Sequence, residues 1–452
     1  MLSKATGTDT AEQVVEIKRL DPAVVNRTYN YRGLAKETNV LVTTGGAVST
    51  ATVSQLKSVG CKVTVLGTMG AASTTFTATP GCVVMDGSAM NPEDCAKAVA
   101  GKDVVIHAGM PTPDACTGAL DQGTRNLLEA AATAGVKAFV YGSSASVVFS
   151  GQDLKAVSEN APYPSRFADP CAASIAEAEK AVLAANAAKF TTTTTSMMLT
   201  CSVRAASVYG LGEDQEAASA PASAERLLLP GLASRAKTGA RPVGDGTNVV
   251  DFVYAGNVAH ALLLAAQALL LPLTPAPAAP APASASTSAS AAAAVAGRAF
   301  FVTDMEPVPF GEFAGRALSR LGYPAPSSAS GGPGEIPVLL ATLLAFLLRV
   351  VALVVSPLFE FRPALTSLRV AEESAVRRFD TTRATKDLGY APLWNQEEAL
   401  DITLHGATAL RNPRAKLKHI GPFTAAEVAR HSSEDDAWII VDGKVRRVPF
   451  HR

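Results

Sequence analysis

The chain has 452 residues, which is long for a single hydrophobic core and predicts two or three structural units. Its 40 Lys and Arg residues balance 40 Asp and Glu residues, so no excess of positive charge indicates a nucleic-acid partner. Six cysteines without CxxC or CxH spacing argue against a zinc site or a disulfide framework and favour a reducing compartment.

The first 37 residues contain no apolar run and mix acidic with basic side chains. This composition fits neither a secretory signal peptide nor an organelle transit peptide. We therefore expect residues 1–37 to form a flexible N-terminal extension.

From Asn39 onward, short β-branched runs alternate with helical segments. The first run, NVLVTT, is followed by a glycine turn, a helical segment and a second run, CKVTVLG, which is a βαβ unit and implies parallel strands. Further runs of this kind are CVVMD, DVVIHAG, KAFVYGSS and MMLTCSVR. The repeated alternation predicts an α/β fold with a doubly wound parallel sheet, and the looser pattern beyond about residue 210 predicts a smaller C-terminal lobe.

Two later segments depart from this pattern. Residues 272–296 are Pro/Ala/Ser-rich and uncharged, which predicts a flexible or partly extended insertion. Residues 336–356 are almost wholly apolar and match the length that crosses a bilayer, with Thr342 and Arg349 as the obstacles. This segment either associates with a membrane, spanning it or lying in one leaflet, or forms a buried helix pair.

Four segments together resemble one family: VYGSSASVVFSGQDL, VRAASVYGLGED, GDGTNVVDFVYAGNVAH and FFVTDMEPVPF. They are similar to the 3β-hydroxysteroid dehydrogenases among the extended short-chain dehydrogenases, in particular to the decarboxylating sterol-4α-carboxylate 3-dehydrogenases. The resemblance covers residues 38–405. It implies a Rossmann domain that binds NAD or NADP, a substrate lobe, and oxidation of the 3β-hydroxyl of a sterol or steroid. It also implies contact with the endoplasmic reticulum membrane through the apolar segment, and a homodimer is a further expectation.

The catalytic pair of that family is missing from this chain. The family pattern has a Tyr and a Lys four residues apart, on one face of a helix, where the ammonium lowers the pKa of the phenol. Cys171 and Ile175 occupy these positions. A Cys171 thiol could donate a proton, but it lacks the lysine that would tune it. The chain is therefore either an NAD(P)-dependent sterol dehydrogenase or a catalytically dead member that binds a sterol, a nucleotide or a protein as a scaffold.

The resemblance also assigns Ser144, which aligns with the family's serine that binds the substrate oxygen. The alternative is a serine that caps the next turn, and Ser146 is a second candidate for the same role. Arg204, Tyr209, Asp251, Tyr254 and Asn257 also match family positions, and some of them are expected to tie loops together.

The phosphate-binding loop is altered as well. The family form is TGGxGxxG, and this chain keeps Gly45 and Gly46 but has Val48 and Ala51 at the later glycine positions. A valine side chain at the position of close approach is expected to crowd a pyrophosphate. The loop either binds dinucleotide weakly or serves only as a turn between strand and helix.

Three further positions bear on the cofactor. Gly67 stands where the ribose-binding acid is expected, so NAD and NADP are not distinguished. Asp86 matches the family's adenine-contacting acid, or else belongs to a helix N-cap. His107 ends the fourth strand at the carboxyl edge of the sheet, where it either faces the cofactor or has a structural role.

Residues 422–452 resemble the opening third of a cytochrome b5-type domain, through FTAAEVARH and DDAWIIVDGKV. His451 lies near the place of the first haem ligand but lacks the Pro-Gly-Gly turn that follows it in that family, and the second ligand has no counterpart. Haem binding is therefore not expected, and Trp438 with its neighbours is expected to form a strand.

Overall fold

The computed structural model describes most of the chain between Val14 and Arg447. The described residues are 14–18, 22–25, 27, 29–31, 34, 37–44, 46–67, 81–108, 119–187, 197–210, 228–271, 292–324, 336–355, 365–405, 407, 410–412, 416–420, 432–433, 436–441 and 444–447.

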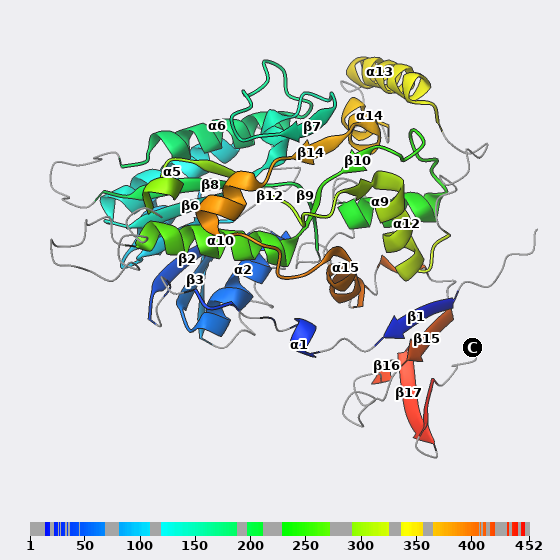
Figure 1. Ribbon diagram of the computed structural model, residues 1–452, viewed down its shortest axis with the longest axis horizontal. Helices are drawn as coiled ribbons and strands as arrows, with labels where there is room; N and C mark the ends of the chain where they lie inside the picture. Colours follow the sequence, from blue (N-terminus) through cyan, green and yellow to red (C-terminus); the bar gives the residue numbers. More distant parts are fainter. Residues whose placement is uncertain are drawn as a thin grey trace, which may run out of the picture.

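A seven-stranded sheet forms the centre of the molecule, in the order β12-β8-β6-β5-β2-β3-β4 (Figure 1). All six pairings between its strands are parallel, which confirms the predicted doubly wound sheet. The strand bounds are β2 Asn39–Thr43, β3 Lys62–Gly67, β4 Cys82–Asp86, β5 Val104–His107, β6 Ala138–Ser144, β8 Leu199–Ala205 and β12 Ala299–Val302. The order reverses at β2, so a crevice is expected at the carboxyl ends of β2 and β5.

Helices cover both faces of this sheet. One face carries α2 (Gly46–Val59) and α10 (Ala255–Leu270), and the other carries α4 (Pro92–Val99), α5 (Ala119–Thr133) and α6 (Pro170–Ala184). Alternate strand residues enter the two cores, since side chains along a strand point to opposite faces. In β2, for example, Val40 and Val42 join the α2/α10 core and Leu41 joins the other.

A smaller lobe lies beyond the carboxyl edge of the sheet. Its strands are β7 Leu154–Val157, β9 Ser207–Tyr209, β10 Val249–Val250, β11 Phe252–Tyr254, β13 Val308–Pro309 and β14 Arg377–Phe379. Its helices include α9 Leu228–Thr238, α12 Phe310–Arg320, α14 Ser367–Ser374 and α15 Gln396–His405. The lobe has its own core, in which the rings of Phe252 and Phe313 stack 3.9 Å apart between centroids. The predicted smaller lobe is thus present.

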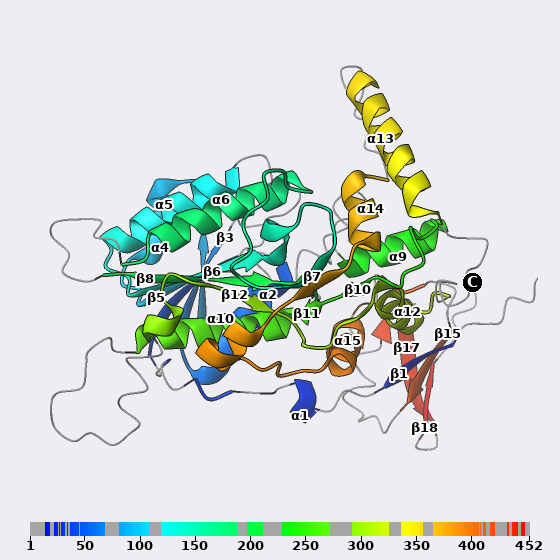
Figure 2. The ribbon, with the colours of Figure 1, turned by 45° about the horizontal axis from the view of Figure 1, so that its top comes forward.

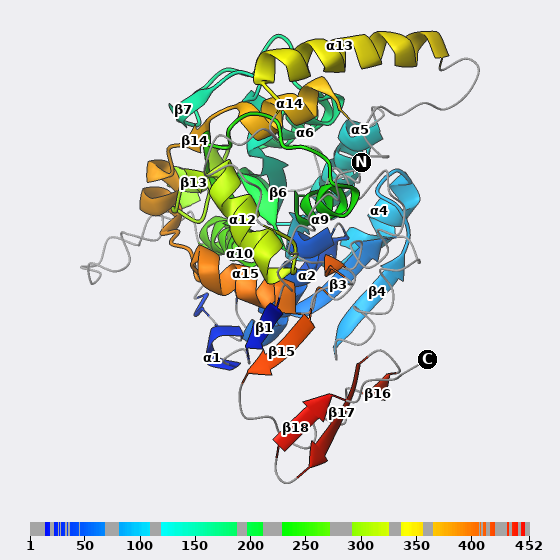
Figure 3. The same ribbon diagram turned by 90° about the vertical axis from the view of Figure 1, so that its right-hand side faces the viewer.

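The described part of the N-terminal segment contains regular structure that the sequence did not indicate. β1 (Val14–Lys18) pairs in parallel with β15 (Lys416–Ile420), and the short helix α1 (Pro22–Val25) follows (Figure 3). Tyr31 is 3 % exposed and its hydroxyl lies 2.7 Å from Nδ1 of His260 in the main body. The described part of residues 1–37 is therefore tied to the rest of the protein, which corrects the expectation of a flexible extension.

The other irregular segments are described in part. Residues 292–295, at the end of the predicted insertion, form a helical turn whose Ala292 and Val295 are fully buried, and residues 272–291 lie outside the described residues. At the C-terminus, β16 (Ser432–Ser433), β17 (Asp436–Val441) and β18 (Lys444–Arg447) form an antiparallel sheet. The strand predicted around Trp438 is thus confirmed, whereas His451 lies outside the described residues.

The apolar segment 336–356 forms helix α13 (Val338–Val355), which extends away from the other helices (Figure 2). Its small residues Ala341 and Ala345 are buried against the region of α14, in a cluster with Val243 and Val370. Among the described residues, no helix combines the length and the apolarity that crossing a bilayer requires.

Candidate active site

The loop after β2 places one of the two predicted glycines at the start of helix α2. Gly46 opens that helix with a φ of 67°, a conformation that glycine adopts without strain, and Gly45 lies outside the described residues. The free N–H groups of a helix N-terminus attract phosphate. The described end of α2 therefore keeps one glycine of the predicted loop at the N-terminus of a helix.

Val48 lies differently from the expectation. Its side chain is only 3 % exposed and belongs to the hydrophobic core between the sheet, α2 and α10. Most of the side chain therefore contacts protein, not the open side of the loop where a pyrophosphate would lie. The steric block expected from this valine is weaker than the sequence indicates.

The position of the ribose-binding acid is filled by another residue. A Cβ atom added to Gly67 would lie 2.2 Å from Oγ1 of Thr44, which is far inside van der Waals contact. The backbone N–H of Thr44 also donates to the carbonyl of Leu66, which fixes the loop against the end of β3. Thr44 thus occupies the space in which an acidic side chain at residue 67 would begin.

Asp86 ends the edge strand β4, directly opposite Gly67 in the register, and its side chain is exposed. The following helix α4 is capped by Asn91, whose side chain accepts a hydrogen bond from the N–H of Glu93. The alternative that Asp86 belongs to this helix cap is therefore wrong. Asp86 thus lies at the carboxyl edge of the sheet, and its contact with adenine stays a prediction.

His107 is held on both sides of its ring. Nδ1 lies 2.8 Å from Oγ1 of Thr43, and Nε2 lies 3.1 Å from Oγ1 of Thr124 on α5. Burial lowers its pKa from 6.5 to about 4, so the imidazole is neutral at physiological pH. The ring links two strands to a helix, and this geometry favours the structural role that the sequence left open.

Ser144 stands at the carboxyl end of β6 and starts a 3₁₀ turn, Ala145–Val148. Its Oγ accepts a hydrogen bond of 3.1 Å from the N–H of Ser146, so the capping role is present. That bond leaves the hydroxyl hydrogen free to donate elsewhere, since a hydroxyl both donates and accepts. The structure thus allows Ser144 to cap the turn and to bind a substrate oxygen at the same time.

Cys171 and Ile175 lie one turn apart in the first half of α6. Cys171 is disulfide-bonded, although the cysteine spacing argued against a disulfide framework, whereas Cys61, Cys82, Cys95 and Cys201 are free. A disulfide sulfur carries no proton, so Cys171 cannot act as the proton donor considered above. Ile175 is 4 % exposed and packs in the core beneath α5 and α6.

Two buried hydroxyls on these elements have no hydrogen-bond partner among the residues that the structure describes. They belong to Ser143, next to Ser144 on β6, and Ser174, next to Ile175 on α6. An unsatisfied buried hydroxyl costs about 1–3 kcal/mol. The region thus keeps polar side chains while the phenol and ammonium expected from the family pattern are absent.

Comparison with known proteins now decides the family. The sequence matches the 3-beta hydroxysteroid dehydrogenase/isomerase family over residues 69–330. It is 32 % identical to the mouse sterol-4-alpha-carboxylate 3-dehydrogenase, decarboxylating, over 73 % of this chain and 80 % of the relative. The chain belongs to the 3-beta hydroxysteroid dehydrogenase/isomerase family.

Among its relatives is isoform 2 of the 3beta-hydroxysteroid-dehydrogenase/decarboxylase of Arabidopsis thaliana, with 32 % identity over 74 % of this chain. The match spans only 53 % of that plant protein. Among solved structures, a dTDP-glucose 4,6-dehydratase from Streptomyces venezuelae with NAD and TYD bound matches with a TM-score of 0.55. It is 18 % identical and the match covers 83 % of this chain and 99 % of that one, so this likeness shows the fold alone.

In this member of the family, the second half of α6 is anchored by a buried ion pair. Glu179 accepts from Nη2 of Arg204 at 2.7 Å, from Oγ of Ser202 at 2.7 Å and from the hydroxyl of Tyr163 at 2.7 Å. Desolvation raises the pKa of Glu179, but Arg204 and the other donors outweigh it and the net pKa is lowered. Arg204, one of the residues matched to the family, is therefore structural.

The other matched residues tie the lobe together. The carboxyl group of Asp304 accepts from the hydroxyl of Tyr209 at 2.8 Å, from the N–H of Tyr254 at 2.9 Å and from Nδ2 of Asn257 at 2.8 Å. Desolvation raises the pKa of Asp304 to about 7 despite these donors. Asp251 likewise accepts from the N–H of Phe379 at 2.8 Å. These polar groups hold strands and turns in place.

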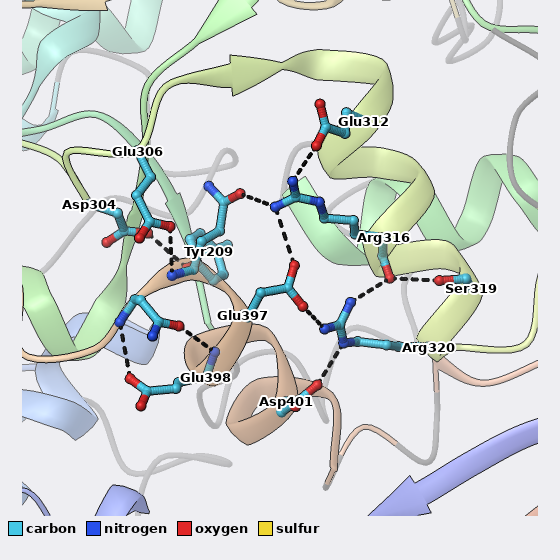
Figure 4. Close-up of polar contacts among 12 residues, drawn as sticks. Tyr209, Asp304, Glu306, Glu312, Arg316, Ser319, Arg320, Glu397, Glu398 and Asp401 are labelled. Atoms are coloured by element: carbon cyan, nitrogen blue, oxygen red, sulfur yellow. Dashed lines mark hydrogen bonds and ion pairs between the residues drawn. The ribbon is translucent and has the colours of Figure 1, made fainter. Parts of the chain in front are cut away.

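Beside this cluster, α12 and α15 are joined by an ion-pair network (Figure 4). Arg320 pairs with Asp401 at 2.7 Å and also with Glu397, which in turn pairs with Arg316 at 3.2 Å. These pairs are partly solvated, and exposed ion pairs are individually weak. The network positions the outer helices of the lobe against one another.

Helix α13 presents an apolar surface to solvent. Among the side chains of α13 that the structure describes, ten large apolar ones are exposed, from Leu339 at 84 % and Val354 at 70 % to Leu344 at 40 %. Soluble surfaces seldom carry a continuous apolar patch of this kind, and such patches mark interaction sites. The buried-helix alternative for residues 336–356 is therefore wrong for most of α13.

Proposed function

We propose that this protein binds NAD(P) and a sterol with a 3β-hydroxyl group at the carboxyl edge of the sheet, and oxidises that hydroxyl to a ketone. Membership of the 3-beta hydroxysteroid dehydrogenase/isomerase family supports this reaction class, as do the names of the relatives. The observation that carries the proposal is the position of Ser144, with its hydroxyl hydrogen free, at the carboxyl end of β6.

The residues present fit a dinucleotide at two of three places. The N-terminus of α2, opened by Gly46, would hold the pyrophosphate, and exposed Asp86 would face the adenine. At the ribose, Thr44 fills the place of the acidic residue beside Gly67. When bound, the oxidised nicotinamide supplies a hydride acceptor. The altered ribose position predicts little discrimination between NAD and NADP.

The residues of this chain can hold the substrate hydroxyl but do not provide a group that accepts its proton. Ser144 would donate its hydroxyl hydrogen to the substrate oxygen and hold the carbinol in place. Oxidation also removes the hydroxyl proton, and the family's Tyr–Lys pair would accept it. With Cys171 disulfide-bonded and Ile175 buried, that proton must pass to solvent. Loss of a general acid–base group typically lowers the rate by about 10²–10⁴-fold, so we expect slow turnover.

A second candidate function is binding without turnover, in which the protein acts as a sterol- or nucleotide-binding scaffold. The disulfide at Cys171 favours it, because it removes the last titratable group from the position of the family's tyrosine. Calorimetric titration with NAD and NADP, combined with a single-turnover assay on a 3β-hydroxysterol, separates the two. Binding with slow ketone formation supports the dehydrogenase, binding with no ketone supports the scaffold, and no binding up to millimolar concentration contradicts both.

We further propose that α13 lies in one leaflet of the endoplasmic reticulum membrane. Its exposed apolar residues would gain contact with lipid, while Arg349 could extend its guanidinium toward the interface. Substitution of Leu343 and Leu347 by Asp should release a tagged protein from vesicles or microsomes, and substitution of Val83 by Asp on the distant edge strand β4 serves as the control. Equal membrane binding by all three proteins would contradict the proposal.

A further inference from the structure

Cys171 lies in the first turn of α6, directly after Pro170, and is partly exposed to solvent. Its sulfur is disulfide-bonded, and the other four cysteines among the described residues are free, so its partner is not one of the described residues. A disulfide that is accessible from solvent can be opened by a thiol reductant. The cysteine pattern of the sequence favours a reducing compartment, in which this opening is expected.

The first turn of α6 lies against the 3₁₀ turn that begins after Ser144. The N–H of Ala168, three residues before Cys171, donates to the carbonyl of Phe149 at 3.3 Å, and Phe149 ends that turn. Helix α6 also contacts the turn directly. Cys171 therefore begins its helix beside the carboxyl end of β6, where the proposed function places the substrate oxygen.

Ser174 stands one turn after Cys171 on the same side of α6, since residues i and i+3 are neighbours on a helix. It is only 8 % exposed, and its hydroxyl has no hydrogen-bond partner in the part of the chain that the structure describes. Helical side chains lean toward the N-terminus of their helix, so this hydroxyl is directed toward the first turn. It can donate a hydrogen bond to an anion that forms there.

The N-terminus of α6 also favours an anion. Asp169, the N-cap residue, makes no side-chain hydrogen bond to the first turn, and a helix N-terminus lowers the pKa of a thiol beside it. The charged groups nearby are of both signs. The carboxylate of Asp169 interacts with that of Glu372, and the guanidinium of Arg377 lies over the ring of Phe149. A free thiol already ionises by a few per cent at neutral pH, so a reduced Cys171 can accept a proton.

We propose that the disulfide at Cys171 is a redox switch and that its reduction makes Cys171 the proton acceptor of the reaction. A dithiol gives two electrons and two protons to the disulfide, which becomes two thiols while the dithiol becomes a disulfide. The inference rests on the proposed sterol oxidation. In that step the C3–H bond breaks and its hydride passes to the cofactor, while the hydroxyl proton passes to the Cys171 thiolate and from there to solvent. The oxidised protein holds the substrate through Ser144 but has no acceptor at position 171.

The first test compares the full chain after treatment with dithiothreitol and after oxidation with diamide, in single-turnover ketone formation from a 3β-hydroxysterol with NAD. Reduction should raise the rate by about 10- to 100-fold, at the low end of what a general base contributes, because the ammonium of the family pattern is absent. Cys171→Ser should gain nothing from dithiothreitol, since an alcohol does not ionise at neutral pH. Cys82→Ser is the matched control at another partly exposed cysteine and should keep the full gain.

The second test locates the sulfur without the cofactor. Iodoacetamide should alkylate Cys171 in the reduced protein and not in the oxidised protein, which mass spectrometry of the peptides measures. A 3β-hydroxysterol at about ten times its Kd should slow this alkylation roughly tenfold, because the bound sterol covers the sulfur. Alkylation of Cys82 should not change with the sterol.

Each result has a separate meaning. If Cys171→Ser without reductant is as fast as the reduced wild-type protein, the opening of the bond raises the rate and the thiolate does not, which overturns the inference. Equal ketone formation by reduced and oxidised wild-type protein, or no protection of Cys171 by the sterol, overturns it as well, while the proposed oxidation stands. If neither state forms ketone, the proposed function fails and this inference falls with it.

Discussion

The two halves of helix α6 differ in whether their polar side chains have hydrogen-bond and ion-pair partners. In the second half, Glu179 is fully buried, and Arg204, Ser202 and Tyr163 all donate to its carboxylate. In the first half, Cys171 is disulfide-bonded, Ile175 is apolar, and the hydroxyl of Ser174 has no hydrogen-bond partner in the described part of the chain. The second half of the helix thus carries a fully hydrogen-bonded ion pair, whereas the first half lacks the Tyr–Lys pair expected from the family pattern.

This difference shows that the residues that hold a fold and those that carry its chemistry are separable, even at positions four residues apart. Ile175 and Glu179 lie on the same face of α6, since residues i and i+4 are neighbours on a helix. Removing Glu179 would leave the Arg204 charge buried without a partner, whereas an isoleucine at 175 packs in the core. The fold therefore constrains position 179 far more than position 175.

Restoring the catalytic pair should produce the largest effect. We expect Cys171→Tyr combined with Ile175→Lys to raise sterol oxidation by about 10²–10⁴-fold, because a phenol tuned by an ammonium can accept the hydroxyl proton. The two substitutions should act as a unit, so each alone should give much less. The assay is single-turnover ketone formation from a 3β-hydroxysterol.

The matched control for this experiment is Cys171→Phe with Ile175→Lys, which lacks only the phenolic oxygen. It also breaks the disulfide and buries the same ammonium, so it reports any effect of those changes. Equal rates for the two double variants would show that proton transfer is not what the first half of α6 lacks. An inactive tyrosine variant that still binds NAD would mean that further site residues have changed.

Substitution of the buried acid in the second half of α6 should lower the stability of the protein. Glu179→Gln should lower the free energy of unfolding by about 3–5 kcal/mol, because it leaves the buried Arg204 without its carboxylate. Glu177→Gln is the control, since Glu177 forms an exposed pair with Lys180 that is worth at most about 0.5 kcal/mol. Denaturant unfolding measures both. Similar losses in the two variants would remove the distinction between the halves.

Much of this architecture follows from the sequence because it depends on local repetition. Alternating strands and helices specify a parallel sheet, since consecutive parallel strands need a crossover connection. The loop glycine Gly46, the edge residue Asp86 and the strand-end Ser144 all lie at the predicted ends of strands. The sequence therefore predicted the positions of these residues in the fold correctly, and their roles in binding stay predictions.

The features that the sequence missed depend on contacts between distant residues. The guanidinium of Arg377 contacts Ser207 and Phe149, which are 170 and more than 200 residues away in the chain. Tyr31 is buried because its hydroxyl contacts His260, which is 229 residues away in the chain, and no local sequence pattern predicts that contact. Thr44 fills the ribose position only because β2 and β3 end side by side.

In the smaller lobe, the pKa of a buried carboxyl group is shifted in the opposite direction to that of Glu179 on α6, because burial outweighs hydrogen bonding. Among its described neighbours, Asp304 also has three donors but no cation, and desolvation raises its pKa from 3.8 to about 7. A raised pKa means that the folded state binds the proton more tightly. Its contribution to stability is full below pH 3.8 and is lost as the pH rises through 7, amounting to roughly 4 kcal/mol at most.

We therefore expect Asp304→Asn to flatten the decline in unfolding free energy between about pH 4 and pH 7. The asparagine can still accept from Tyr254 and Asn257, and the hydroxyl of Tyr209 can rotate to accept from its amide. Urea unfolding at several pH values measures the slope. An unchanged slope would mean that Asp304 is ionised in the folded protein, as Glu179 is.

The smallest expected effect is on cofactor preference, which depends on the residues at the predicted ribose position. These residues can be changed without disturbing the sheet. Gly67→Asp alone should weaken dinucleotide binding, because its Cβ would meet the Thr44 side chain at 2.2 Å. Combining it with Thr44→Gly clears that space and places a carboxylate where it can accept from the ribose hydroxyls. The double variant should prefer NAD over NADP by about tenfold, since the carboxylate repels a 2′-phosphate. Thr44→Gly alone is the control, and titrations with both cofactors give the ratio. If the double variant binds NAD and NADP equally, the ribose does not lie at the end of β3. The carboxyl edge of the sheet would then differ from that of the relatives by more than the side chains at positions 44 and 67.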